Sequence, residues 1–259
     1  MMKELEKLDV TLNMSRNVEV IEAAIESTGL GMNPSGKPTV QDVAAGRDVL
    51  KLIDVKVKEA EEYFWRPLDS PEVYKRLTAL ATAVGDDRMA MDYETKMRLI
   101  EANEFEFLGR MSRFYGNNKK ALGYYTRALE LAPDHPLAGP DAEKASKAVD
   151  RASGELERAQ RTLGSNPEDK KAWYRQAVAY MNLDKADEAI ESYHRTTELD
   201  PEDADAWAKK GTALLSLERY DEARPLLEKA LELKPNSLTA KRGLNYLRYF
   251  TTGATTDLD

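Results

Sequence analysis

The chain has 259 residues, a formal net charge of −8 at pH 7, two histidines and no cysteine. Without cysteine it forms neither a disulfide nor a thiolate metal site, and its acidic balance disfavours nucleic-acid binding, which needs concentrated positive charge. The charged opening MMKELEKLDV lacks the apolar core of a signal peptide and no apolar run is long enough to span a membrane, so we expect a cytoplasmic protein.

The first part of the chain is predicted to form a helical hairpin. Apolar residues recur at helical spacing over about 15–29 and again over about 39–65. The glycine- and proline-rich stretch between them is typical of a loop. Two prolines in RPLDSP, residues 66–71, end the second helix. We therefore predict that residues 1–70 form an N-terminal domain of their own.

The loop of this hairpin contains an incomplete phosphate-binding motif. Residues 31–37, GMNPSGK, match the first seven positions of GxxxxGK[ST], in which backbone N–H groups and the lysine hold the phosphates. The next position should supply a hydroxyl for Mg²⁺, and here it is Pro38. The motif also follows a predicted helix instead of a strand. We interpret it as a connector, and a nucleotide-dependent enzyme with a site near Lys37 is the alternative of another class.

Four prolines further along the chain follow one another at intervals of 34 residues: Pro133, Pro167, Pro201 and Pro235. This period is typical of stacked helix-turn-helix units, each too small to bury its own apolar face. Large and small residues also recur between the prolines: Phe105, Leu108, Gly109, Ala121, Tyr125 and Ala128; Trp173, Ala177, Tyr180, Ala189, Tyr193 and Thr196; Trp207, Gly211, Leu214, Ala223, Leu227 and Ala230. The large side chains fill gaps between helices, and the small ones let backbones approach.

This pattern resembles the tetratricopeptide repeat (TPR) family, whose Trp, Leu-Gly, Tyr, Ala, Phe, Ala and Pro positions these residues match. The resemblance implies an all-α protein, with a right-handed helical-repeat solenoid over residues 71–250 after the N-terminal hairpin. The expected parts are a divergent first repeat at about 71–102, repeats at 102–135, 170–203 and 204–237, a cap helix at 237–250 and a flexible tail at 251–259.

Residues 136–167 depart from the repeat pattern. They have no opening aromatic residue and no Leu-Gly pair, and Glu155 stands where a small residue belongs. Apolar residues step by three and four from Ala142 to Leu163, which is the spacing of one continuous helix. Gly154 interrupts this ladder at a cost of only about 1 kcal/mol. The segment is either a degenerate helical pair or one long helix, and the ladder favours the latter.

In the TPR family, the first helices of successive units line a concave groove that binds partner proteins. The resemblance therefore implies a non-enzymatic interaction scaffold that binds a partner peptide or helix. The groove residues that it implies are Phe107, Arg110, Lys171, Tyr174, Arg175, Val178 and Lys209. Both Tyr174 and Arg175 are expected to point away from the helix-helix seam.

Some members of this family hold acidic chaperone tails in a carboxylate clamp of lysine, arginine and asparagine side chains. Lys171 and Arg175 match two positions of the clamp. Glu106, Arg110 and Asp141 replace three others. Because the two acidic residues would repel such a ligand, the pattern disfavours the clamp.

The predicted cap helix carries more aromatic residues than a cap needs: Tyr246, Tyr249 and Phe250. They are candidates for a terminal interface, so a self-assembling module joined through its ends is the alternative among binding proteins. A helical repeat that binds nucleic acid is a further alternative, distinguished by strong salt dependence. The expected partner is a protein or peptide, not a nucleic acid or membrane, and the oligomeric state stays open. His135 and His194 lack a catalytic or metal-binding pattern, so we expect no cofactor.

Overall fold

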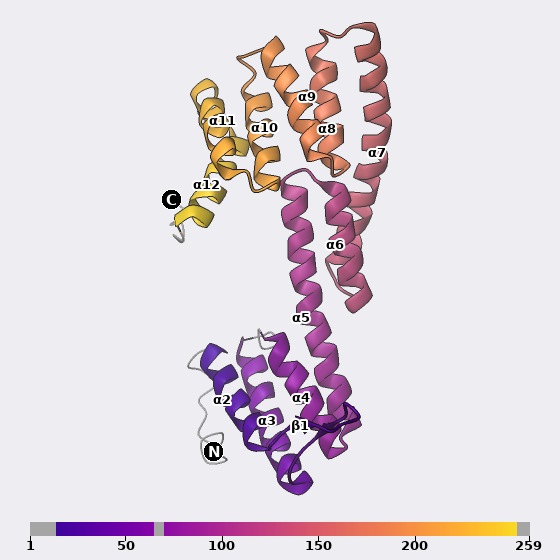
Figure 1. The fold of residues 1–259 in the computed structure, drawn as a ribbon, viewed down its shortest axis with the longest axis vertical. Coiled ribbons are helices and arrows are strands. Elements are labelled where there is room, and N and C mark those ends of the chain that lie inside the picture. The colour runs from indigo at the N-terminus through magenta and orange to yellow at the C-terminus, as the bar shows by residue number, and fades with distance from the viewer. Residues whose placement is uncertain (1–13, 65–69, 253–259) are drawn as a thin grey trace. The chain divides into compact units, whose positions relative to one another are not determined.

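The computed structural model describes residues 14–64 and 70–252, which are almost entirely helical (Figure 1). The helices are α2 (Met14–Ser27), α3 (Val43–Phe64), α4 (Pro71–Val84), α5 (Asp87–Phe114), α6 (Asn118–Leu131), α7 (Ala138–Ser165), α8 (Lys170–Asn182), α9 (Ala186–Leu199), α10 (Ala204–Ser216), α11 (Tyr220–Leu233) and α12 (Leu238–Thr252). Two short strands, β1 (Gly31–Met32) and β2 (Pro38–Thr39), pair antiparallel. The all-α prediction is confirmed, with this small ribbon as an unpredicted addition.

The chain divides into two compact units, the first made of residues 1–104 with 128–135 and the second of 105–127 with 136–259. In the first unit, α2, α3, α4 and the start of α5 share one apolar core, to which Ile25, Ile53 and Leu77 belong. The core thus extends past the predicted boundary at residues 66–71. The apolar face of α4 packs onto the two helices of the predicted hairpin and continues their core.

Helix α5 runs unbroken for 28 residues through the point near residue 102 where the repeat pattern predicts a turn. Ala90 and Ala121, which hold matching positions in the pattern, are 31 residues apart instead of 34. From Asp87 to Leu108 the sequence has neither glycine nor proline. Because nothing interrupts the helix, the second helix of the first predicted repeat and the first helix of the next one are fused.

Two regular helix pairs, α8 with α9 and α10 with α11, form the centre of the second unit. Asp169 and Asp203 cap α8 and α10, and their carboxylates accept hydrogen bonds from the N–H groups of Ala172 and Ala206 at 2.9 and 3.0 Å. Asp184 and Glu218, which lie 34 residues apart, take the left-handed conformation at the turns inside the pairs, with φ of 61° and 59°. The spacing of these turns repeats the spacing of the prolines.

Tryptophans at equivalent positions fasten each pair to the loop before it. The indole N–H groups of Trp173 and Trp207 donate to the carbonyl oxygens of Pro167 and Pro201 at 2.8 and 2.9 Å. Both rings are only half-buried. Trp207 also packs against the core of the second unit, and both side chains hold the loops between repeats.

Helix α7 is a single helix of 28 residues, so the structure has the long helix and not the degenerate pair. Asp150, which lies 34 residues before the turn residue Asp184, is in the middle of this helix. The residues that α7 buries are alanines at intervals of seven: Ala138, Ala145, Ala152 and Ala159. This stripe of small side chains lets α7 lie close to its neighbours in the second unit (Figure 1).

Candidate functional site

A groove of about 330 Å³ lies between α7 and α8 in the second unit. The residues that line it are Ala148, Arg151, Ala152 and Glu155 from α7, and Tyr174, Arg175, Val178, Ala179 and Asn182 from α8. Alanines at 152 and 179 are buried and make its floor. Three residues of the predicted groove, Tyr174, Arg175 and Val178, are thus brought together here.

Tyr174 forms a fixed wall of this groove. Its ring packs edge-on against Tyr193, with ring centroids 5.8 Å apart and an interplanar angle of 72°. Burial raises the pKa of Tyr174, and the nearby carboxylates of Asp205 and Asp203 raise it further, so the phenol is neutral at physiological pH. The expectation that Tyr174 points away from the helix-helix seam is wrong, because its ring belongs to the edge of the core.

The charges of the α7–α8 groove are unbalanced. Arg151 and Arg175 are exposed, and within residues 14–64 and 70–252 neither forms an ion pair. The one carboxylate of the groove, Glu155, pairs with Arg158 at 2.6 Å. Asn182 donates from its side chain to the carbonyl of Val178 at 2.7 Å. Two guanidinium groups therefore remain available for a ligand that carries negative charge.

The other predicted groove residues lie elsewhere. Phe107, on α5, lines a second and larger cavity of about 480 Å³. Arg110 extends from the same helix toward Glu106, with 3.7 Å between Nε and Oε1. Lys171 is exposed and Lys209 half-buried, and neither lines the α7–α8 groove or the second cavity. The structure thus separates residues that the repeat pattern places in one groove.

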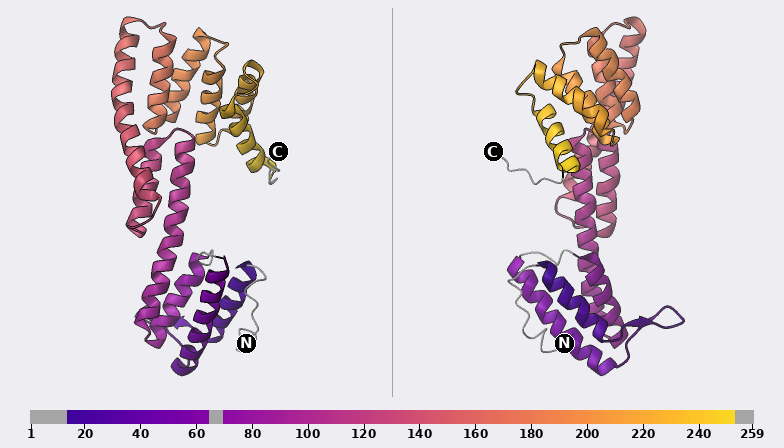
Figure 2. Two further views of the ribbon diagram at one scale, coloured as in Figure 1. Left: turned by 180° about the vertical axis from the view of Figure 1, so that it is seen from behind. Right: turned by 60° about the vertical axis from the view of Figure 1, so that its left-hand side comes forward.

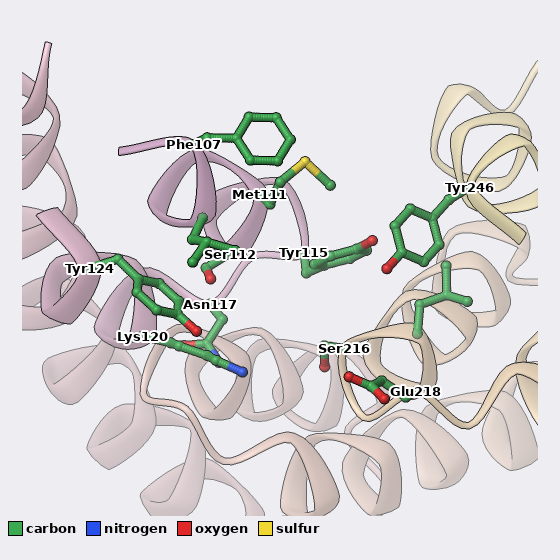
Figure 3. Close-up of a pocket in the computed structure, with 12 residues that line it drawn as sticks. Phe107, Met111, Ser112, Tyr115, Asn117, Lys120, Tyr124, Ser216, Glu218 and Tyr246 are labelled. Carbon is green, nitrogen blue, oxygen red and sulfur yellow. The ribbon is translucent and has the colours of Figure 1, made fainter. Parts of the chain in front are cut away.

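The second cavity, which we call the aromatic pocket, also contains a residue of the predicted terminal interface (Figure 3). Its lining residues are Phe107, Leu108, Met111, Ser112, Tyr115, Asn117, Lys120, Tyr124, Leu215, Ser216, Glu218 and Tyr246. The ring of Tyr246 packs edge-on against Tyr115 at 5.4 Å between centroids. The side chains of Tyr249 and Phe250 lie outside the described residues.

Sequence reasoning missed Met111 and Tyr115, although a signal for them exists. They follow Phe107 at intervals of four, which is the spacing of one helix face, and Tyr115 directly follows the last residue of α5. Burial raises the pKa of Tyr115, and burial together with Tyr246 raises the pKa of Tyr220 to about 12. These phenols are neutral at physiological pH, so the charge of the pocket comes from Lys120 and Glu218.

The motif at residues 31–37 forms the turn of the β1–β2 hairpin, which extends away from the helices of the first unit (Figure 2). The side-chain oxygen of Asn33 accepts hydrogen bonds from the backbone N–H groups of Ser35 and Lys37 at 3.0 and 2.8 Å. In a phosphate-binding loop such N–H groups face the phosphates and a helix follows directly. This loop has the geometry of a hairpin turn instead.

Neither histidine lies in a metal-binding cluster: the described residues contain no group of three or more His, Asp or Glu side chains placed to hold a metal. Nε2 of His135 is 2.9 Å from Oδ1 of Asn103, and the residue is buried. On the exposed face of α9, Nε2 of His194 is 3.4 Å from a carboxylate oxygen of Glu198. Within the same described ranges, no helix is both long and apolar enough to cross a membrane.

The regular helix pairs and their shared turn geometry define a helical-repeat protein. A family model described as "Tetratricopeptide repeat" matches residues 139–195 and 174–237. Residues 139–237 of this chain therefore match the tetratricopeptide repeat family, as their sequence pattern predicts. Among proteins with curated descriptions, none matches the chain in sequence.

Several solved structures resemble parts of the chain. The TPR domain of Arabidopsis OM64 is 21% identical and covers 59% of this chain and 98% of its own, with a TM-score of 0.32. YrrB, described as a TPR protein with an unusual peptide-binding site, is 20% identical over 73% of this chain and 97% of its own, with a TM-score of 0.36. The first TPR of Spaghetti (RPAP3), bound to an HSP90 peptide, is 20% identical over 59% and 94%, with a TM-score of 0.32.

Proposed function

We propose that this protein is an interaction module that binds a segment of a partner protein in the α7–α8 groove. The observation that carries the proposal is the composition of this groove. A floor of small side chains lies between a fixed tyrosine and two arginines that form no ion pair with any described residue. Tyrosine and arginine are the residues that most often dominate binding energy at protein interfaces. The proposed role of the chain is binding, not catalysis.

The shape of the groove favours a peptide segment as the ligand. Its volume of about 330 Å³ is at the lower end of the range of ligand pockets, which suits a few side chains and not a whole domain. Ala148, Ala152 and Ala179 leave room for a peptide backbone to come close. Val178 and the ring of Tyr174 provide apolar contacts, and Arg151 and Arg175 favour acidic side chains next to an apolar one.

A photo-crosslinking amino acid at position 148 tests this proposal and identifies the partner. Ala148 lines the groove and is half-buried, so a partner segment bound there lies within reach of the crosslinker. The same amino acid at Arg224, an exposed position on α11, is the control. Mass spectrometry of material crosslinked in the native host should give a partner peptide at position 148 that is missing at position 224.

The affinity of that partner should then depend on the two arginines. Arg151→Glu combined with Arg175→Glu should weaken binding by at least about 2 kcal/mol, or roughly 30-fold. Since both side chains are exposed, the fold should survive. Arg224→Glu with Arg242→Glu makes the same change of charge outside the groove and should leave the affinity within about threefold. Equal weakening by both doubles, or by neither, would show that the α7–α8 groove is not the binding surface.

A further inference from the structure

The aromatic pocket is larger than the α7–α8 groove and shares no residue with it. Its walls come from α5, the turn after α5, α6, the end of α10, the turn after α10, and α12, all in the second unit (Figure 3). Rings or aliphatic chains of Phe107, Met111, Tyr115 and Tyr246 face the cavity from two sides. Its volume of about 480 Å³ falls within the range of pockets that bind ligands.

The walls of the pocket are held in place by their neighbours. Tyr115 lies at the centre, with its ring edge-on to Phe114 at 5.3 Å and to Tyr246 at 5.4 Å between centroids. The turn after α5 is fixed by side-chain hydrogen bonds from Asn117 to Asp184 and from Asn118 to Asn182. A pocket whose walls are fixed in advance loses little conformational freedom when a ligand binds.

The rim of the pocket leaves apolar surface exposed to water. The side chain of Phe107 is 57% exposed and that of Leu108 is 41% exposed. Phe105, two residues before Phe107, instead stacks against Tyr124 at 6.4 Å between centroids. Contact between an apolar ligand and the rim removes this surface from water, which favours binding.

Two opposite charges, Lys120 and Glu218, also line the pocket. Neither side chain makes an ion pair within the described part of the chain. Asp184, the residue equivalent to Glu218 in the preceding repeat, uses its carboxylate to accept the hydrogen bond from Asn117. Glu218 adopts the same left-handed backbone conformation, with φ of 59°. The equivalent position in the turn after α5 is Gly116, which also has a positive φ. A glutamate at this position is thus explained neither by the backbone conformation nor by an ion pair with another described residue.

We infer that the aromatic pocket is a second binding site, for a partner protein segment whose one or two large apolar side chains lie between a basic and an acidic residue. The apolar side chains fill the cavity against Phe107, Met111 and Tyr115. The basic residue pairs with Glu218 and the acidic residue with Lys120. This charge pattern gives the segment one direction along the pocket, and it discriminates against segments of reversed order.

A phage library of random dodecapeptides, selected on the immobilised full chain, tests this inference and needs no identified partner. The selected peptides should share large apolar residues with a basic residue on one side and an acidic residue on the other. Phe107→Ser should weaken their binding, measured by fluorescence polarisation, by at least about tenfold. Leu238→Ser is the matched control, since Leu238 is exposed on α12 but does not line the pocket.

The charge assignment has its own test in a double exchange of the two residues. The variant Lys120→Glu with Glu218→Lys should select peptides in which the order of the basic and acidic residues is reversed. Both exchanged side chains are exposed, so the fold should be kept. The inference is overturned by a selection that enriches no peptide, by peptides that bind Phe107→Ser as well as wild type, or by an unchanged charge order in the double exchange. It is also overturned when the peptides are lost only with Arg151→Glu and Arg175→Glu, which places them in the α7–α8 groove.

Discussion

Replacing Gly109 with alanine tests the close approach between α5 and α6. A Cβ atom at Gly109 would lie 2.4 Å from Cε1 and 2.7 Å from Cδ1 of Tyr125. Carbon atoms do not approach this closely in packed proteins, so the ring or the helix must move. The ring of Tyr125 is fully buried and packs with Ala121 and Ala145, which leaves it little room.

The expected cost follows from two opposing effects. Alanine is preferred over glycine inside a helix by about 1 kcal/mol, whereas forcing an extra methyl group into a packed core costs about 1–3 kcal/mol. Gly109→Ala should therefore destabilise the protein by up to about 2 kcal/mol. In a later repeat, Ala177 holds the position equivalent to Gly109 and lies opposite Tyr193. The two helices of a repeat can therefore pack with an alanine at this position, which limits the cost to this range.

Gly123→Ala is the matched control, because Gly123 is exposed on α6 and a Cβ atom there meets nothing within 4 Å. In this variant alanine brings its higher helix propensity without a steric clash, so the variant should be more stable than wild type by up to about 1 kcal/mol. Urea denaturation followed by circular dichroism measures both variants, and hydrogen exchange of α5 and α6 peptides locates the change. Equal stability of the two variants would show that the helices lie further apart at Gly109 than the structure has them.

Substitutions at three further positions test other parts of the structure. Trp207→Phe should cost about 1 kcal/mol in urea denaturation, because it deletes the hydrogen bond to Pro201 but keeps a ring, and Trp207→Ala should cost about 2–4 kcal/mol. Asp141 is partly buried, which opposes its ionisation, but hydrogen bonds from Lys144 and Arg113 hold its pKa below the usual value. Its contribution to stability is therefore present above about pH 4 and lost as the pH falls through the lowered pKa; Asp141→Asn should lose less stability than wild type between about pH 5 and pH 2. Lys37→Ala should leave the melting temperature unchanged, and calorimetric ATP binding that disappears in this variant would contradict the interpretation of the loop as a hairpin turn.

The helix pairs α8–α9 and α10–α11 agree closely with the sequence pattern, because the signals that define them are local. The predicted units begin at residues 170 and 204, where α8 and α10 begin. Prolines end the second helices, capping aspartates start the first ones, and tryptophans recur at one position. Each of these signals acts within a few residues of its own position, so it does not depend on the rest of the fold.

The first unit and α5 were harder to predict because they depend on distant packing and on a missing signal. The prolines near residue 70 predict a break between helices, but only packing decides whether α4 joins the hairpin. The fusion of two helices in α5 has a sequence cause, since the 31-residue spacing and the lack of a helix breaker near Ala102 both point to it. The family period predicts a turn there, and the local sequence provides none.

The candidate site was predicted in part because the long helix α7 changes what stands beside α8. The repeat pattern predicts Tyr174, Arg175 and Val178 as groove residues of α8, and all three line the α7–α8 groove. The repeat pattern expects a repeat helix as the opposite wall. In the structure this wall is α7, whose stripe of buried alanines lets it lie against α8. Beside this stripe, Arg151 and Glu155 line the groove, at positions that the repeat pattern did not assign to the binding surface. Selectivity in this groove should therefore depend as much on the sequence of α7 as on the repeat positions of α8.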